Sequence, residues 1–117
     1  MPTKLMVVWT NPVSKEAEEE YNTWYNKVHL PDVLRVPGFV AATRYRYTGV
    51  PALEGMDDPP HRYLALYEVN AENVKEAAEV LAAGVGAGEI ALSEALDMSS
   101  FAAHFFEPVS DRLVEEK

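Results

Sequence analysis

Residues 21–47 read YNTWYNKVHLPDVLRVPGFVAATRYRY, a stretch that combines the second half of a predicted helix with the strand that follows it. The helix is predicted from a stripe of apolar side chains at spacings of three and four. The stripe comprises Ala17, Tyr21, Trp24, Tyr25 and Val28. Ser14 precedes a run of glutamates, and this order suits a helix start. Because Pro31 disfavours helical geometry at Leu30, we expect the helix to end near His29.

The residues before and after this stretch are predicted to form the remaining strands and a second helix. A proline- and glycine-rich loop is predicted at residues 49–60, and a second helix is predicted to begin at Asn70 or Glu72. Gly84, Gly86 and Gly88 interrupt that helix, and residues 90–96 are predicted to form a further short helical piece. Four strands are predicted, at residues 5–10, 39–48, 62–69 and 100–109. The order β-α-β-β-α-β is that of an α+β, ferredoxin-like fold with a four-stranded antiparallel sheet.

The composition limits the classes of protein and partner. The chain has 117 residues, of which 48% are hydrophobic, so we expect one domain over residues 1–117. No apolar run is long enough to cross a membrane, and the N-terminal apolar segment is too short for a signal peptide, so we expect a cytoplasmic protein. A net charge of -9 without a Lys/Arg cluster argues against nucleic acid and anionic membranes as partners. The absence of cysteine excludes disulfides, thiol nucleophiles and Cys-ligated metals.

The predicted strands carry apolar side chains on both faces. Two helices cover only one face of a four-stranded sheet, and an apolar second face needs another layer. A second copy of the chain, related by a two-fold axis, is the natural source of that layer. We therefore expect a homodimer through the sheet face, in which two sheets pack against each other as a dimeric α/β barrel.

His29 is the leading candidate for a catalytic residue. It lies at the predicted end of the first helix, and the pKa of an unperturbed imidazole is close to neutral, as a general acid or base requires. Asp32 lies three residues further on, where its carboxylate would reach a ring nitrogen, fix the tautomer and favour the imidazolium. A structural interpretation also fits, in which His29 stabilises the helix C-terminus and Asp32 caps the next turn.

Further candidates are a second histidine and a set of aromatic and basic side chains. His104, in the predicted fourth strand, would meet the aromatic residues of the first helix if its face turned toward the helices; otherwise it is a core histidine bonded to backbone. Tyrosines donate hydrogen bonds to developing enolates and arginines bind carboxylates, but tyrosines in strands more often simply pack. The predicted substrate-binding residues are Trp9, Trp24, Tyr25, Arg44, Tyr63, Tyr67 and Phe106. Scattered histidines without a ligand motif do not predict a metal site.

Several of these motifs, taken in order, resemble the EthD-like group of dimeric α/β-barrel proteins. They are Trp24-Tyr25, His29-Leu30-Pro31-Asp32, Val36-Pro37-Gly38-Phe39, Ala42, Arg44-Tyr45 and Arg62-Tyr63-Leu64-Ala65-Leu66-Tyr67-Glu68. The resemblance implies a ferredoxin-like fold that dimerises and binds its substrate between the sheet and the helices of each subunit. It also implies that His29 is the catalytic residue, that Asp32 is its partner, and that the chemistry is proton transfer without a cofactor.

Three hypotheses for the function follow. The first is a homodimeric enzyme of the cyclase, dehydratase or lyase type, similar to polyketide cyclases, in which His29 moves a proton on an aromatic or carbonyl-rich small molecule. Tyr25, Tyr67 and His104 would line its pocket. The second is a cofactor-free monooxygenase, in which Trp9, Trp24 and the tyrosines hold a phenol near oxygen. The third is a non-catalytic dimeric module that binds a ligand or takes part in a stress response. No cofactor is expected.

Overall fold

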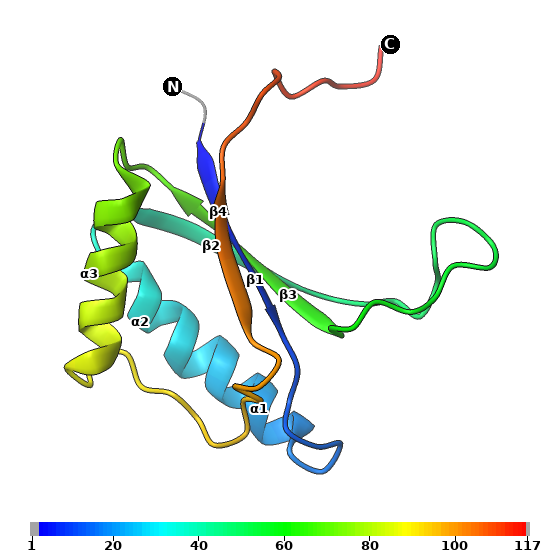
Figure 1. The fold of residues 1–117 in the computed structure, drawn as a ribbon, viewed down its shortest axis with the longest axis horizontal. Helices are drawn as coiled ribbons and strands as arrows, with labels where there is room; N and C mark the ends of the chain where they lie inside the picture. Colours follow the sequence, from blue (N-terminus) through cyan, green and yellow to red (C-terminus); the bar gives the residue numbers. More distant parts are fainter. Residues whose placement is uncertain (1–2, 117) are drawn as a thin grey trace.

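The computed structural model describes residues 3–116 and contains a four-stranded sheet with helices packed against one side of it (Figure 1). In chain order the elements are β1 (Lys4–Thr10), α1 (Glu18–Trp24), η1 (Tyr25–His29), α2 (Leu30–Leu34), β2 (Phe39–Arg46), β3 (Tyr63–Val69), α3 (Val74–Gly86) and β4 (Ala102–Phe106). Elements α1, η1 and α2 follow one another without a break, so they act as the single first helix of the predicted order. The α+β, ferredoxin-like fold is therefore confirmed.

The sheet has the strand order β2-β3-β1-β4, and all neighbouring strands are antiparallel. The central strand β1 places Met6 between Tyr67 of β3 and Phe105 of β4. The register of β2 against β3 shifts at a bulge between Phe39 and Ala41. Because successive side chains of a strand point to opposite faces, this register fixes which residues face the helices.

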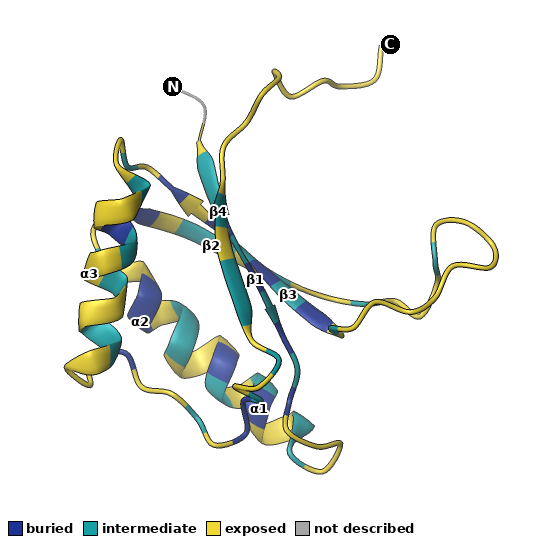
Figure 2. Ribbon diagram, in the orientation of Figure 1, coloured by how far each residue is buried: buried dark blue, intermediate teal, exposed yellow. Residues whose placement is uncertain are grey.

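The helix-covered face of the sheet carries the core. Along β3 every second side chain is buried, beginning with Tyr63 and ending with Val69, while the intervening residues are partly buried or exposed. The first helix contributes aromatic side chains to the same layer, and Tyr21 and Tyr25 are 0% and 1% exposed. Figure 2 shows these buried positions in dark blue along the strands and on the helix side that faces them. The aromatic residues of the stripe predicted for the first helix therefore face the core, whereas Val28, its last member, is exposed.

The opposite face of the sheet has no helix over it among the described residues (Figure 1). Its apolar side chains are partly buried by their neighbours within the sheet, and those of the two inner strands are Leu5, Val7, Trp9, Leu64 and Leu66. On the two edge strands, Tyr45 and Phe106 are each 50% exposed. We call this the open face.

Pro31 predicted that the first helix ends near His29. In the structure the helix continues to Leu34. Its middle segment η1 is a π-helix, in which the N–H of Leu30 bonds to the carbonyl of Tyr25. In an α-helix, proline removes one hydrogen bond and clashes with the carbonyl four residues before it. Here the wider π turn comes just before Pro31, which then occupies one of the first positions of α2, where an amide hydrogen is not needed. The helix therefore passes the proline.

The glycines after residue 83 mark the end of α3. The N–H of Gly88 bonds to the Val85 carbonyl at 3.1 Å, and the N–H of Glu89 bonds to the Gly84 carbonyl at 2.9 Å. This pair of bonds is a Schellman motif, which requires the left-handed conformation that Gly88 adopts with φ of 78°. Ile90 then folds back over Gly84, where an added Cβ would lie 3.0 Å from the Ile90 Cδ1.

Residues 89–96, which we call the strap, cross the fold after this turn and contain no helix. The short helical piece predicted at residues 90–96 is therefore wrong. At its far end, Leu96 pairs with Pro12 in an isolated β-bridge, and the N–H of Val13 bonds to the Ala95 carbonyl at 2.8 Å. The apolar residues of the strap have a helix-like spacing in the sequence, but they are buried at separate points of the core. Tertiary contacts, and not a helix, therefore fix the backbone of the strap.

Strands β2 and β4 are each shorter than predicted by two residues or more, and β3 begins one residue later than predicted. β2 ends at Arg46, and β4 is limited to Ala102–Phe106 because β1 pairs with it only from Leu5 to Trp9. The connection between β2 and β3 and the segment after β4 both project away from the sheet (Figure 1). Within the described part of the chain, no helix combines the length and apolar character that a bilayer span requires.

Candidate functional site

An apolar cavity of about 380 Å³ lies between the sheet, the helices and the strap. Its volume is in the range of small-molecule sites. Apolar lining side chains include Met6, Val8 and Phe105 from the sheet, Leu81 and Val85 from α3, and Ile90, Leu92 and Leu96 from the strap. The ionisable side chains in the lining are Tyr25, His29 and Tyr67. The cavity therefore offers a few polar groups in a mostly apolar enclosure.

His29 lies in the wall of this cavity, with its ring between two aromatic neighbours. Its ring centroid is 4.7 Å from that of Trp24, at an interplanar angle of 30°, and 5.1 Å from that of Tyr25, nearly perpendicular to it. The Nδ1 atom is buried and has no hydrogen-bond partner. Burial lowers the pKa of His29 to about 4, although the Asp32 carboxylate acts in the opposite direction. The imidazole is therefore neutral at physiological pH.

Two tyrosines face the same cavity. Tyr25 and Tyr67 are each 1% exposed, and the Tyr67 hydroxyl is buried without a hydrogen-bond partner. Burial raises the pKa of Tyr25 to about 12 and raises that of Tyr67 as well, so both phenols keep their protons. Each is therefore a hydrogen-bond donor at neutral pH. Of the residues predicted to bind substrate, Trp24, Tyr25 and Tyr67 line the cavity.

The sequence suggested a bond between Asp32 and a ring nitrogen of His29, but the free nitrogen Nδ1 has no such bond. One of the Asp32 carboxylate oxygens pairs with the Arg35 guanidinium, and the other accepts a hydrogen bond from the Ala91 N–H at 3.4 Å. Asp32 has these two partners because the helix continues through Pro31. Arg35 then lies one helical turn after Asp32, and the strap, which carries Ala91, lies beside the helix. Asp32 thus makes no hydrogen bond to the imidazole, and its charge raises the pKa of His29.

His104, Trp9 and Phe106 lie on the open face, away from the cavity. His104 pairs with Val7 across the β1–β4 ladder, and this register turns its side chain away from the helices. Its ring and that of Phe106 are each 6.3 Å from the Trp9 ring. The expectation that His104 lines the pocket is therefore wrong, as it is for Trp9 and Phe106. The neighbours Ala103 and Phe105 face the cavity instead.

Arg44 belongs to a polar cluster beside the cavity. Its guanidinium stacks over the Tyr25 ring, 4.1 Å from the centroid, and donates to the side-chain oxygens of Asn26 and Asn22 at 2.8 and 2.9 Å. Asn22 in turn donates to the Tyr63 hydroxyl at 3.2 Å. We call Arg44 and these four partners the Arg44 cluster. Arg44 and Tyr63, which were predicted to bind substrate, thus form internal bonds and are not in the cavity lining.

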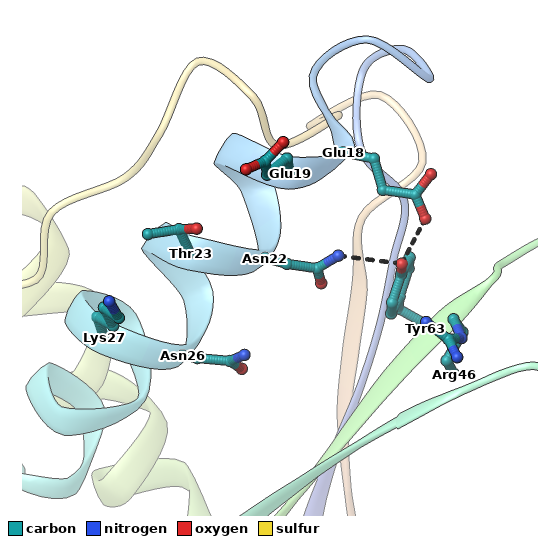
Figure 3. A pocket seen from close by; sticks show the side chains of 8 residues that line it. All are labelled: Glu18, Glu19, Asn22, Thr23, Asn26, Lys27, Arg46 and Tyr63. Carbon is teal, nitrogen blue, oxygen red and sulfur yellow. Dashed lines mark hydrogen bonds between the residues drawn. The ribbon is translucent and has the colours of Figure 1, made fainter.

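A surface groove of about 460 Å³ lies outside the Arg44 cluster, between the first helix and the sheet (Figure 3). Figure 3 shows Asn22 and Asn26 extending from the helix toward the sheet, and Tyr63 bonded to both Asn22 and Glu18. Glu18 and Glu19 give the groove negative charge, and Lys27 and Arg46 give it positive charge. Because Asn22, Tyr63 and Glu18 are bonded in series and Asn26 bonds to Arg44, the cavity is the stronger candidate for a binding site.

Several cavity residues were not predicted from the sequence. The strap residues and Met98 and Phe101 are examples, and their apolar side chains carry no signal that separates them from ordinary core residues. The glycines at the end of α3 were the available signal, since they mark the point where the chain leaves the helix to cross the cavity. No group of three His, Cys, Asp or Glu side chains that could hold a metal ion occurs within residues 3–116.

The strand order and the helix layer define a ferredoxin-like fold. One similar solved structure is an EthD-family protein from Bacillus halodurans C-125, with 18% identity, a TM-score of 0.60, and coverage of 93% of this chain and 100% of that one. A dimeric ferredoxin-like protein from an uncultured marine organism has 10% identity and a TM-score of 0.59, covering 98% and 95%. A Streptomyces coelicolor monooxygenase in complex with nanaomycin D has 16% identity and a TM-score of 0.56, covering 97% and 94%.

At these identities the similarity establishes the fold and leaves the activity open. No protein-family model matches the sequence, and no curated protein matches it.

Proposed function

We propose that the protein is a small-molecule enzyme that transfers protons without a cofactor, with His29 as the proton acceptor in the apolar cavity. The reaction belongs to the cyclase, dehydratase or lyase type, and the substrate is an aromatic or carbonyl-rich molecule. The observation that carries this proposal is the pair of buried polar atoms in the cavity wall, the Nδ1 of His29 and the hydroxyl of Tyr67, that have no partner in the protein.

Unpartnered buried polar atoms are costly, by about 1–3 kcal/mol each, and a folded protein normally pairs them. A ligand that enters the cavity is the available source of partners. The apolar walls favour a flat hydrophobic body, while the Tyr67 hydroxyl would donate to a carbonyl oxygen and the His29 nitrogen would accept an acidic proton. These features match an enolisable aromatic ketone or a phenol.

The chemistry would use a neutral imidazole and a neutral phenol. His29 is unprotonated at neutral pH because burial lowers its pKa to about 4, so it is ready to accept a proton. A pKa this low makes it a weak base in the empty cavity. The enolate or phenolate that forms beside the ring would favour the imidazolium and raise the pKa during proton transfer. The hydrogen bond from Tyr67 would stabilise the developing oxyanion.

A cofactor-free monooxygenase is the second candidate, because one structure of the same fold is a monooxygenase with a bound nanaomycin D. In this case His29 would deprotonate a phenol, and the phenolate would react with oxygen dissolved in the apolar cavity. Oxygen uptake separates the two reactions. A non-catalytic binding module would bind the same ligands and turn over neither substrate.

The proposed enzyme is a homodimer through the open face. The apolar side chains of that face, including Val7 and Leu66, have no helix over them, and one structure of the same fold is described as dimeric. We expect light scattering at micromolar concentration to give twice the mass of one chain. The Leu66→Glu variant should give the monomer mass, because a buried unpaired charge costs several kcal/mol. The control Val80→Glu, at an exposed position of α3, should remain dimeric. A monomeric mass for the unmodified protein would refute the dimer.

Proton transfer can be tested with a model substrate. We propose to follow the exchange of the α-protons of 2-tetralone in D₂O by NMR, because this ketone is flat, apolar and enolisable. The protein should accelerate the exchange, and His29→Gln should remove about 100-fold or more of that acceleration, the usual contribution of a general base. His61→Gln is the matched control, since His61 bonds to the Ser100 carbonyl outside the cavity and should leave the rate unchanged.

Equal exchange rates with the unmodified protein and the His29→Gln variant would exclude His29 as the base. An oxygen electrode, with 1-naphthol as the phenol, tests the second candidate in parallel. Oxygen consumption that depends on His29 would favour the monooxygenase. Saturable binding of both probes with neither exchange nor oxygen uptake would favour a binding module.

A further inference from the structure

The strap is held over the cavity at Ala91 by two side chains of the helix that carries His29. The Ala91 carbonyl accepts a hydrogen bond from the indole Nε1–H of Trp24 at 3.1 Å, and its N–H donates to the Asp32 carboxylate at 3.4 Å. Trp24 and Asp32 lie on either side of His29 in the sequence, five residues before it and three after it. Because Ala91 belongs to no helix or strand, these side chains supply the bonds that a regular element would provide.

The strap and His29 are close neighbours. The indole that bonds to Ala91 also stacks on the imidazole, with the ring centroids 4.7 Å apart. The Ala91 backbone is near enough to raise the pKa of His29, although burial lowers it more. On either side of Ala91, Ile90 and Leu92 contribute to the cavity wall. Release of the strap at Ala91 would therefore admit water to the imidazole.

We propose that Asp32 is a positioning residue, which holds the strap closed over His29 through the Ala91 N–H and does not exchange a proton with the substrate. Its second oxygen is paired with Arg35, whose side chain is 70% exposed, so that pair lies at the surface. The free Nδ1 of His29 has no bond to the carboxylate. This role concerns the cavity of the proposed function, but it does not require that the cavity be catalytic.

Asp32 affects the imidazole in two ways that have opposite signs. Its negative charge favours the imidazolium and raises the pKa of His29. Its bond to Ala91 keeps water out, which favours the neutral ring and lowers that pKa. Among the other groups around the ring, Arg44 of β2 lowers the pKa, Tyr25 and Tyr67 are neutral phenols, and the lining side chains from α3, β4 and the strap are apolar. The net direction of change on removal of Asp32 therefore reveals which effect dominates.

The test is an NMR titration of the His29 imidazole in the full-length protein with two substitutions at one position. Asp32→Ala removes both the charge and the acceptor, so the strap should open and the pKa should rise from about 4 toward the ordinary 6.5. Asp32→Asn keeps a carbonyl oxygen for the Ala91 N–H but removes the charge, so the pKa should fall below that of the unmodified protein. Exchange of the Ala91 amide hydrogen should be more than tenfold faster in Asp32→Ala than in Asp32→Asn.

Arg35→Gln is the control, because it breaks the ion pair and leaves the bond to Ala91 in place; its His29 should titrate within a few tenths of a unit of the unmodified protein. If Asp32→Ala does not fold, Trp24→Phe removes the other bond to Ala91 and should also raise the pKa. A pKa that falls in Asp32→Ala as it does in Asp32→Asn, or that does not rise in Trp24→Phe, would overturn the proposal. The outcome does not depend on turnover, so it stands apart from the 2-tetralone result.

Discussion

The Arg44 cluster and the cavity are neighbouring regions of the same layer, and they use similar residues in opposite ways. In the Arg44 cluster, both terminal nitrogens of the guanidinium donate to asparagine side chains, although its Nε is buried without a partner. In the cavity, the polar atoms of His29 and Tyr67 that face the apolar walls are left free. The Tyr25 ring contacts both regions. Internal pairing thus distinguishes a structural polar cluster from a candidate binding site that shares an aromatic residue with it.

The largest expected effect is a loss of stability in acid that comes from the cavity. The pKa of His29 is about 4 in the folded protein and 6.5 ordinarily, so the unfolded chain binds more protons between these values. Stability should therefore decrease as the pH falls from 6.5 toward 4, by about 3 kcal/mol in total. Urea unfolding at a series of pH values measures this change.

The His29→Gln variant gives the matched comparison, because glutamine does not titrate. Its free energy of unfolding lacks the His29 contribution. The decrease over this pH window should therefore be about 3 kcal/mol smaller in the variant than in the unmodified protein. If His29→Gln keeps the pH dependence of the unmodified protein, burial does not hold the imidazole neutral, and the difference between the two regions is smaller than the structure indicates.

A smaller effect is expected from removing one hydroxyl beside the Arg44 cluster and one in the cavity. Tyr21 packs against Arg44, and its hydroxyl bonds to the hydroxyl of Thr10, which is 1% exposed. Tyr21→Phe should therefore cost about 1–3 kcal/mol, because the buried Thr10 hydroxyl loses its partner. Tyr67→Phe removes a hydroxyl that has no partner. The free energy of unfolding of this variant should therefore equal that of the unmodified protein within about 0.5 kcal/mol, or exceed it.

Urea unfolding of the two variants tests this contrast, and the 2-tetralone assay adds a functional measurement. Tyr67→Phe should slow the exchange despite its unchanged stability, as is usual for a residue retained for binding. Equal destabilisation by the two substitutions would mean that the Tyr67 hydroxyl has a partner in solution, and the cavity would lose one of its two free polar groups.

The sequence was sufficient for the order of the elements because that order depends on local signals. Alternating apolar residues, the proline and glycine turns and the aromatic stripe of the first helix all act over a few residues. Two local predictions failed where a neighbouring element decides the geometry. Pro31 does not end the helix because the π turn precedes it, and residues 90–96 are not helical because contacts with the cavity wall and the bridge to Pro12 fix their backbone.

The site was harder to predict because it depends on which face of each strand meets the helices. The sequence predicted His29, Trp24, Tyr25 and Tyr67 as site residues, and all four line one cavity. The alternation along β4 separates His104 from Ala103, but only the pairing with β1 determines which of them faces inward. The strap bond at Ala91 joins positions 59 residues apart, and an alanine carries no chemical signal for such a contact.

The π segment η1 also sets the angular phase of the first helix. An α-helix turns by about 100° per residue, so Trp24 and Asp32, eight residues apart, would point about 80° away from each other. The wider π turn rotates less per residue and brings the two side chains closer to one direction, which is why both reach Ala91. The hydrogen bonds of η1, which span one residue more than those of an α-helix, therefore rotate Asp32 toward the direction of Trp24. Replacing η1 by an α-helical segment of the same length would restore the separation of about 80° and leave the strap with a single anchor at Ala91.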